Sequence, residues 1–223
     1  SALDLPPATV GPMSLRLAAA NGDASAEFEV AARLAEGKGT SQDYAEALRW
    51  YQRSAAKGFA QAQYRLGTLY ERGLGVAKDL ERAKVWYSRA AEGGNVKAMH
   101  NLAVLIAGGD QGDYKAAAPW FRKAAEHGLA DSQYNLGVLL ENGLAGDIDQ
   151  AGAYMWYALA AKGGDQDAVA RRDALKSALG ANVLKSAEAK IAGFRARRAV
   201  PLANDARAAG EDWKKRVHND TST

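Results

Sequence analysis

The chain has 223 residues, of which 48% are hydrophobic and 25% charged, a composition typical of a globular protein with a sizeable core. It contains no cysteine, which excludes disulfides, thiol catalysis and thiolate metal sites. The net charge of +3 lies in the residues from 195 onward, and the neutral body lacks the concentrated basic face that nucleic acid requires, so no nucleic-acid partner is expected.

Residues 1–13 contain three prolines and no helical pattern, so we predict an extended N-terminal linker there. No signal-peptide pattern is present and the chain begins with Ser1, so we expect a segment of a longer protein. No apolar run approaches the ~18 residues that cross a bilayer, and membrane attachment is expected only through an absent upstream span. Residues 14–23 match the end of a repeat and are predicted to form a partial N-terminal cap.

The chain then repeats itself four times, in residues 24–59, 60–95, 96–129 and 130–165. A period of this length indicates stacked copies of one helix-turn-helix unit. The third copy is shorter, and the deletion falls around Gly109–Gly112, as expected for a surface turn.

The first half of each copy has small or apolar residues at helical spacing, such as Ala62, Leu66 and Tyr70 in the second copy. Glycine or alanine at positions such as Gly67 allows a second helix to approach closely. A Gly-x-Gly turn follows, and then a recurring aspartate suits the unpaired N–H groups at the start of a second helix. These aspartates are Asp43, Asp79, Asp113 and Asp149.

The second half of each copy carries two adjacent aromatic residues and closes with a glycine. The aromatic pairs are Trp50–Tyr51, Trp86–Tyr87, Trp120–Phe121 and Trp156–Tyr157. Because one pair recurs in every copy, we interpret it as the knob that packs each helix pair onto its neighbour, not as a binding platform.

Residues 166–198 continue the helical pattern with polar substitutions and without the tryptophan column, as a C-terminal cap requires. Residues 199–223 have too few apolar residues to pack alone, so we expect a tail that is flexible or laid along the repeats with Trp213 as its anchor. The predicted fold is an all-α, right-handed α-solenoid of antiparallel helix pairs over residues 14–198.

The recurring pattern A-x-A-x-Y-x-L-G-x-x-Y, followed by A-x-x-W-Y-x-x-A-A-x-x-G, resembles the Sel1-like repeat family, a relative of the tetratricopeptide repeat. This resemblance implies a solenoid that acts as an adaptor. Phrases at Leu15–Ala31, Lys97–Leu105, Asp131–Leu139 and Trp156–Ala161 are similar, more narrowly, to the periplasmic C-terminal region of PodJ-type polar-localisation proteins of alphaproteobacteria.

The narrower resemblance implies a periplasmic segment of an inner-membrane protein at the cell pole. We expect a non-catalytic scaffold that binds a protein or peptide, such as a cell-wall enzyme or a polar protein, in its concave groove. Peptidoglycan binding is the alternative, although the short tail departs from a full glycan-binding domain. Regulation of a sensor kinase is a further alternative.

In tetratricopeptide-like stacks the first helix of each pair lines the concave face. The predicted partner-binding residues are a column of rings with polar neighbours, suited to an extended peptide or a glycan. The rings are Phe28, Tyr64, His100 and Tyr134, and the polar neighbours are Gln61, Thr68, Arg72, Lys97, Asp131 and Asn142. The alternative is that the rings only pack against a neighbouring helix.

We expect neither catalytic residues nor a metal or cofactor. His100, His127 and His218 are far apart and form no zinc motif. The sequence also contains no nucleophile elbow or phosphate-binding loop, and nothing in it marks an acid–base pair in an apolar cleft.

Overall fold

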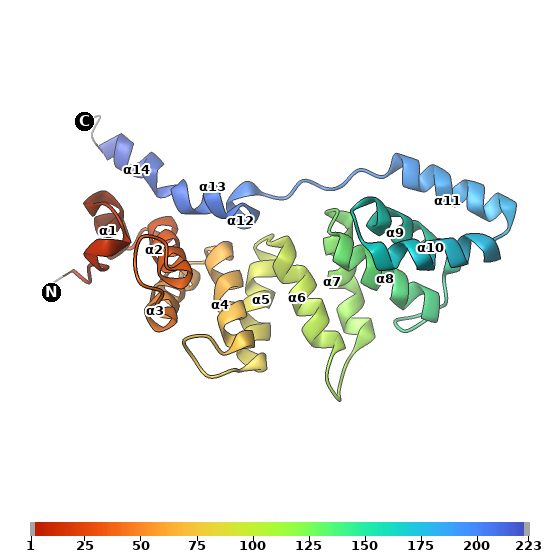
Figure 1. Ribbon diagram of the computed structural model, residues 1–223, viewed down its shortest axis with the longest axis horizontal. Coiled ribbons are helices and arrows are strands. Elements are labelled where there is room, and N and C mark those ends of the chain that lie inside the picture. Colours follow the sequence, from red (N-terminus) through yellow and green to blue (C-terminus); the bar gives the residue numbers. More distant parts are fainter. Residues whose placement is uncertain (1–2, 221–223) are drawn as a thin grey trace. The chain divides into compact units, whose positions relative to one another are not determined.

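The computed structural model describes residues 3–220 and the side chains of residues 3–217 (Figure 1). All regular elements in this part of the chain are helices, stacked as antiparallel pairs, which confirms the predicted fold class. The chain divides into two compact units. Unit 1 takes the chain up to Ala98 together with the residues from Ala199 onward, and unit 2 is Met99–Arg198.

Unit 1 contains two and a half helix pairs and three short helices from the tail. Its elements are η1 (Ala8–Val10), α1 (Met13–Ala20), α2 (Ala24–Glu36), α3 (Tyr44–Ala56), α4 (Ala60–Arg72), α5 (Leu80–Glu92), α12 (Pro201–Asn204), α13 (Ala206–Glu211) and α14 (Trp213–Asp220). The unit boundary falls inside α6 (Val96–Ala107), and the other elements of unit 2 are α7 (Tyr114–Glu126), α8 (Ala130–Asn142), α9 (Gln150–Lys162), α10 (Gln166–Ala178) and α11 (Ala181–Gly193).

Local sequence signals set the helix ends as predicted. The recurring aspartate precedes every second helix and accepts a hydrogen bond from the backbone N–H three residues on, over 2.8–3.0 Å. The first helices α2, α4 and α8 end on a glycine with a φ of 62–69°, which is the left-handed conformation that glycine adopts without strain. These glycines are Gly37, Gly73 and Gly143.

The second aromatic of each pair is buried in every repeat, with at most 3% of its surface exposed. This burial shows that the residue packs inside the protein, and its ring contacts lie within its own repeat, whereas the prediction was packing onto the neighbouring pair. The burial of the tryptophan before it differs between repeats. Trp50 and Trp156 are buried, whereas Trp86 and Trp120 are half-buried.

Two repeats bring their helices especially close. A Cβ at Gly67 would lie 2.6 Å from the ring of Tyr87, and a Cβ at Gly137 would lie 2.7 Å from the ring of Tyr157. The approach places the Tyr87 hydroxyl 2.8 Å from the carboxylate of Glu71, to which it donates, and the fourth repeat has the equivalent bond. Repeats one and three have alanine in place of both the glycine and the glutamate, so neither has the side chain that accepts this bond.

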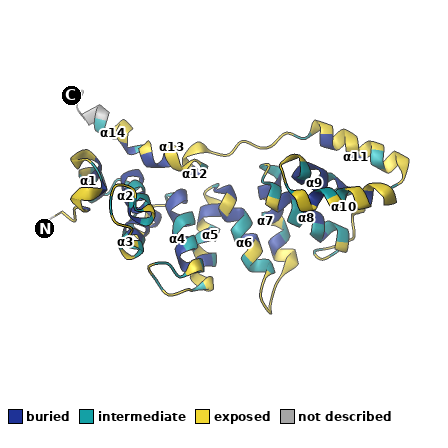
Figure 2. Ribbon diagram, in the orientation of Figure 1, coloured by how far each residue is buried: buried dark blue, intermediate teal, exposed yellow. Residues whose placement is uncertain are grey.

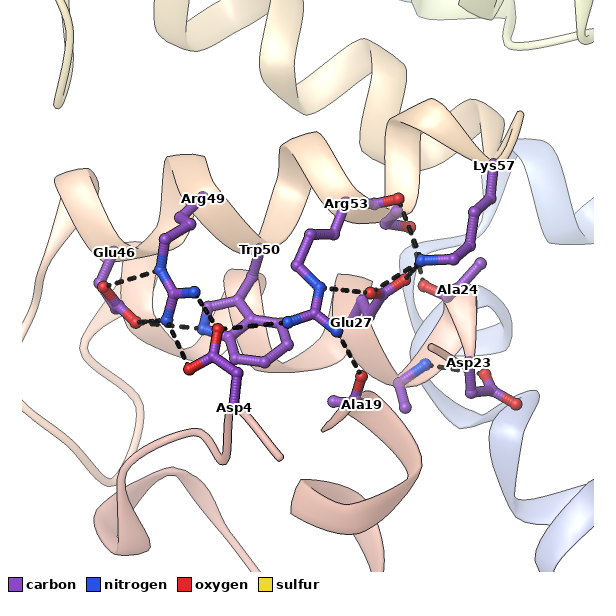
Figure 3. A network of polar contacts seen from close by, with 12 residues as sticks. Asp4, Ala19, Asp23, Ala24, Glu27, Glu46, Arg49, Trp50, Arg53 and Lys57 are labelled. Carbon is purple, nitrogen blue, oxygen red and sulfur yellow. Dashed lines mark hydrogen bonds and ion pairs between the residues drawn. The ribbon is translucent and has the colours of Figure 1, made fainter. Parts of the chain in front are cut away.

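A buried carboxylate joins the first helix pair of unit 1 (Figure 3). Glu27 is 0% exposed, and its oxygens lie 2.9 Å from Arg53 Nε and 2.7 Å from Lys57 Nζ. The Arg53 guanidinium also lies 4.3 Å from the centroid of the Trp50 ring, so one side chain neutralises the carboxylate and covers the indole. Because both cations remain partly exposed, the cluster neutralises Glu27 at a modest desolvation cost.

The N-terminal segment, expected as an extended linker, lies against these helices. Asp4 forms ion pairs with Arg49 and Arg53, and the hydrogen bond from Arg49 lowers the pKa of the Asp4 carboxyl group. Val10, in η1, is 1% exposed. Residues 3–12 are therefore part of the packing of unit 1.

The C-terminal tail lies along unit 1, with α13 and α14 beside α2 (Figure 1). The Ser25 hydroxyl donates to the carbonyl of Ala209 over 2.6 Å and accepts from the N–H of Trp213 over 2.9 Å. Asn95 donates to the carbonyl of Ala203 over 2.6 Å. Trp213 itself is 5% exposed, so the residue expected as an anchor is buried.

In unit 2, α10 and α11 follow the last repeat with little buried surface, and Figure 2 shows most of both helices in the colour of exposed residues. Ala187 and Ile191 are buried, and Phe194 packs edge-on against the Trp156 ring at 5.9 Å. A mostly polar outer surface over a narrow apolar stripe is what the end of a repeat stack needs.

Candidate partner-binding surface

The predicted column of rings packs within the repeats. Each ring contacts the second aromatic of its own repeat, with centroids 5.7–6.1 Å apart: Phe28 with Tyr51, Tyr64 with Tyr87, His100 with Phe121, and Tyr134 with Tyr157. Phe28 is 1% exposed, and the other three are half-buried. Packing thus covers Phe28 completely and leaves the other three rings only partly accessible.

The six predicted polar residues are placed very differently. Gln61 is 3% exposed and offers no surface to a partner. Arg72, Lys97, Asp131 and Asn142 are exposed. The Asn142 amide donates to the carbonyl of Val138, and the Thr68 hydroxyl to that of Tyr64, within their own helices.

The first-helix face, by which we mean the surface of α2 and α4 in unit 1, carries two cavities, and the smaller also reaches Tyr44 and Tyr51 of the second helix α3. The smaller, of about 170 Å³, brings Thr68 and Arg72 together with Arg65. The larger, of about 500 Å³, is lined by α2, by Arg65 and by the tail, including Trp213. Arg65 therefore lies where the two cavities meet.

The first-helix face of unit 2, formed by α6 and α8, carries a hollow of about 270 Å³ with a mostly apolar lining. Val104, Val138 and Asn135 lie on the first helices, and Tyr114 and Leu144 lie at the rim. Val104 is 44% exposed. None of the predicted residues lines this hollow.

Of the predicted residues, Phe28, Thr68 and Arg72 line the cavities of unit 1, whereas Arg65, Val104 and Val138 were missed by the sequence reasoning. Val104 and Val138 occupy the same repeat column as Thr68, and Arg65 directly follows the ring column at Tyr64. Reading the Thr68 column through every repeat would have found both valines. Nothing in the sequence marks Arg65, because its surroundings include the distant tail.

His100 is the one ring in the column that ordinarily titrates near neutral pH, and its environment favours the neutral form. Burial lowers the pKa of His100, partly opposed by the negative charge of Asp131. Its Nδ1 lies 2.6 Å from the hydroxyl of Ser132, which is 0% exposed. A neutral imidazole can form this bond as donor or acceptor, so protonation is not needed for the contact.

This environment predicts a pH dependence of stability. The unfolded chain takes up the His100 proton below a pH of about 6.5, whereas the folded chain takes it up only at lower pH. The free energy of unfolding should therefore fall as the pH drops from about 6.5 towards the folded pKa. Urea unfolding at pH 7.5 and pH 5.5 should show a smaller loss for His100→Phe than for the unaltered chain. An identical loss in both would contradict the assignment.

Among the described residues, no group of three histidine, aspartate or glutamate side chains is placed to hold a metal ion. The side chain of His218 lies outside the described residues. No helix in the described part of the chain has both the length and the apolar character needed to cross a bilayer.

Comparison with known proteins gives a consistent result. The Sel1 repeat family matches residues 24–59, 60–95, 96–129 and 130–165, the same four segments that self-similarity identified. A solved Sel1 repeat protein of Oxalobacter formigenes is 30% identical, with a TM-score of 0.66 over 78% of this chain and 72% of that one.

The solved structure of c5321, a protective antigen of uropathogenic Escherichia coli with an SLR fold, is 26% identical, with a TM-score of 0.52. The match covers 90% of this chain but 50% of that one, so the present chain spans about half of that antigen's length. No protein with a curated description matches the chain.

Proposed function

Because the chain belongs to the Sel1 repeat family, we propose that it is a non-catalytic scaffold that captures a peptide segment of a partner protein on its first helices. The observation that carries this proposal is the hollow beside α6 and α8, whose mostly apolar lining includes Val104, Val138 and the amide-bearing Asn135. Apolar pockets with a few polar groups are the usual form of a binding site, and an amide can pair with a peptide backbone.

The proposal includes a subcellular localisation, the periplasm at the cell pole. The sequences of residues 97–105 and 156–161 are similar to the periplasmic region of PodJ-type polar-localisation proteins, and this similarity supports a periplasmic scaffold at the cell pole. In this reading the partner is itself a periplasmic protein, such as a cell-wall enzyme.

Site-specific photo-crosslinking tests the proposal. Benzoylphenylalanine in place of Val104 or Val138 should crosslink to one segment of one periplasmic protein. Val85 is the matched control, because it is an equally exposed valine, at 48%, on the second helix α5. The rings at 64, 100 and 134 are unsuitable positions, since their loss would disturb packing.

The outcomes separate the alternatives. Crosslinks from 104 and 138 but not from 85 would support capture on the first helices. Equal crosslinks from 85 would contradict it, crosslinks to glycan strands would favour peptidoglycan binding, and crosslinks to a sensor kinase would favour regulation.

A further inference from the structure

The cavity of about 500 Å³ in unit 1 is built from segments far apart in the sequence. Helix α2 forms one wall with Phe28 and Ala32, and the tail forms the opposite wall with Gly210 and Trp213. Trp213 is held in place by the Ser25 hydroxyl and by its own indole N–H, which donates to the carbonyl of Gly210 over 2.8 Å. The tail therefore completes a pocket that the repeats alone leave open.

The lining of this cavity carries a surplus of positive charge. Five cationic side chains face three carboxylates. Glu29 is paired with Arg33 at 2.8 Å, and Glu211 lies between Arg207 at 3.5 Å and Lys214 at 4.0 Å. The third carboxylate, Glu36, and the remaining cations, Lys38 and Arg65, have no ion pair among the described residues. The excess of two positive charges favours an anionic occupant.

Arg65 is the cation best placed to hold that anion. Its Nε is a buried nitrogen without a hydrogen-bond acceptor, and no other buried side-chain nitrogen or oxygen in the described residues lacks a partner. A buried donor without an acceptor is unfavourable, and a ligand oxygen that reaches the Nε–H would satisfy it. A guanidinium presents its N–H groups as a planar fork that matches the two oxygens of a carboxylate.

We propose that this cavity binds a carboxylate group of a peptide, held by the Arg65 guanidinium between the first repeat and the tail. The inference rests on the proposed function and names the anchor that a partner supplies to unit 1. A carboxylate offers two coplanar oxygens to the planar fork of Arg65, and inorganic phosphate is the competing anion in the test.

The test follows the Nε–H resonance of Arg65 in the full chain labelled with ¹⁵N-arginine, assigned through Arg65→Lys. Titration with glutarate should shift this resonance saturably, and the uncharged analogue glutaramide should not shift it. Arg65→Gln should weaken glutarate binding by roughly ten-fold or more, as expected for a lost charge-assisted hydrogen bond, and this is followed at the Trp213 indole N–H in a chain labelled with ¹⁵N-tryptophan. Arg82→Gln, which changes an exposed arginine on α5 outside the cavity lining, should change it less than two-fold.

Three results would overturn the proposal: an Arg65 resonance that glutarate leaves unmoved, an equal response to glutaramide, or tighter binding of inorganic phosphate than of glutarate. Amide exchange in α4 checks that Arg65→Gln remains folded, and Arg65→Lys, which keeps the charge but not the fork, should bind with intermediate strength. The titration reads unit 1 alone, whereas crosslinking at Val104 and Val138 reads unit 2, so either proposal can fail without the other.

Discussion

Replacing Trp50 by alanine should lower the free energy of unfolding of unit 1 by about 3–5 kcal/mol, the usual cost of truncating a fully buried tryptophan. Trp50 is 0% exposed. Its ring lies under the guanidinium groups of Arg53 and Arg49, at 4.3 and 5.1 Å, and its indole N–H donates to Glu46 over 3.2 Å. The truncation therefore removes apolar burial, two cation–π contacts and a hydrogen bond together.

Trp86→Ala is the matched control, because Trp86 occupies the same column of the next repeat. It is half-buried, with Arg89 4.7 Å from its ring, so its loss should cost about half as much. Amide exchange of α3 and α5 in urea measures both variants. Equal destabilisation by the two would show that the N-terminal segment and its arginine cover contribute nothing to Trp50.

Replacing Trp213 by alanine should release the whole tail. The helices α12, α13 and α14 have 4, 6 and 8 residues, and isolated helices below about 12 residues are marginal in water. Truncating a tryptophan that is 5% exposed removes about 3 kcal/mol of packing, more than the remaining polar contacts with Ser25 and Asn95 supply.

Hydrogen exchange and limited trypsin digestion measure this release. In Trp213→Ala, the amides of α13 should lose protection and the bond after Arg207 should be cut much faster, whereas α8 and α9 should keep their protection. Lys214→Ala is the control. The Lys214 side chain, next to Trp213 in the chain, is exposed, and its ion pair with Glu211 is long, at 4.0 Å. Unchanged protection of α13 in the tryptophan variant would contradict the role of Trp213 as the anchor.

The two predictions concern tryptophans whose depth of burial could not be predicted from the residue type alone. All four repeat tryptophans stand in one column, yet their burial differs. At Trp50 the difference follows from Asp4, which fixes two arginines above the ring, and at Trp156 from Phe194, which covers it edge-on. Column position predicted that a tryptophan would be present, but the terminal segments determine how deeply it is buried.

At the candidate site, too, sequence position predicted which residues lie on the first helices, and tertiary packing decides which of them are accessible. The ring column at Tyr64, His100 and Tyr134 was correctly located on the first helices, and the structure shows that each ring packs against an aromatic of its own repeat. The open surface lies four residues further along each helix, at Val104 and Val138. Sequence spacing gives the helix face, but the neighbouring helices decide which of two residues one turn apart on that face packs and which remains accessible.

By itself, the sequence determined the repeat register, the helix pairs and their ends, because capping aspartates, left-handed glycines and helical periodicity act within a few residues of one another. Only the tertiary structure decided where the tail lies, which tryptophans are covered and where Arg65 meets a cavity. Those features depend on contacts such as that between Ser25 and Trp213, which are 188 residues apart in the chain. The sequence around either residue does not indicate a contact with a residue so distant.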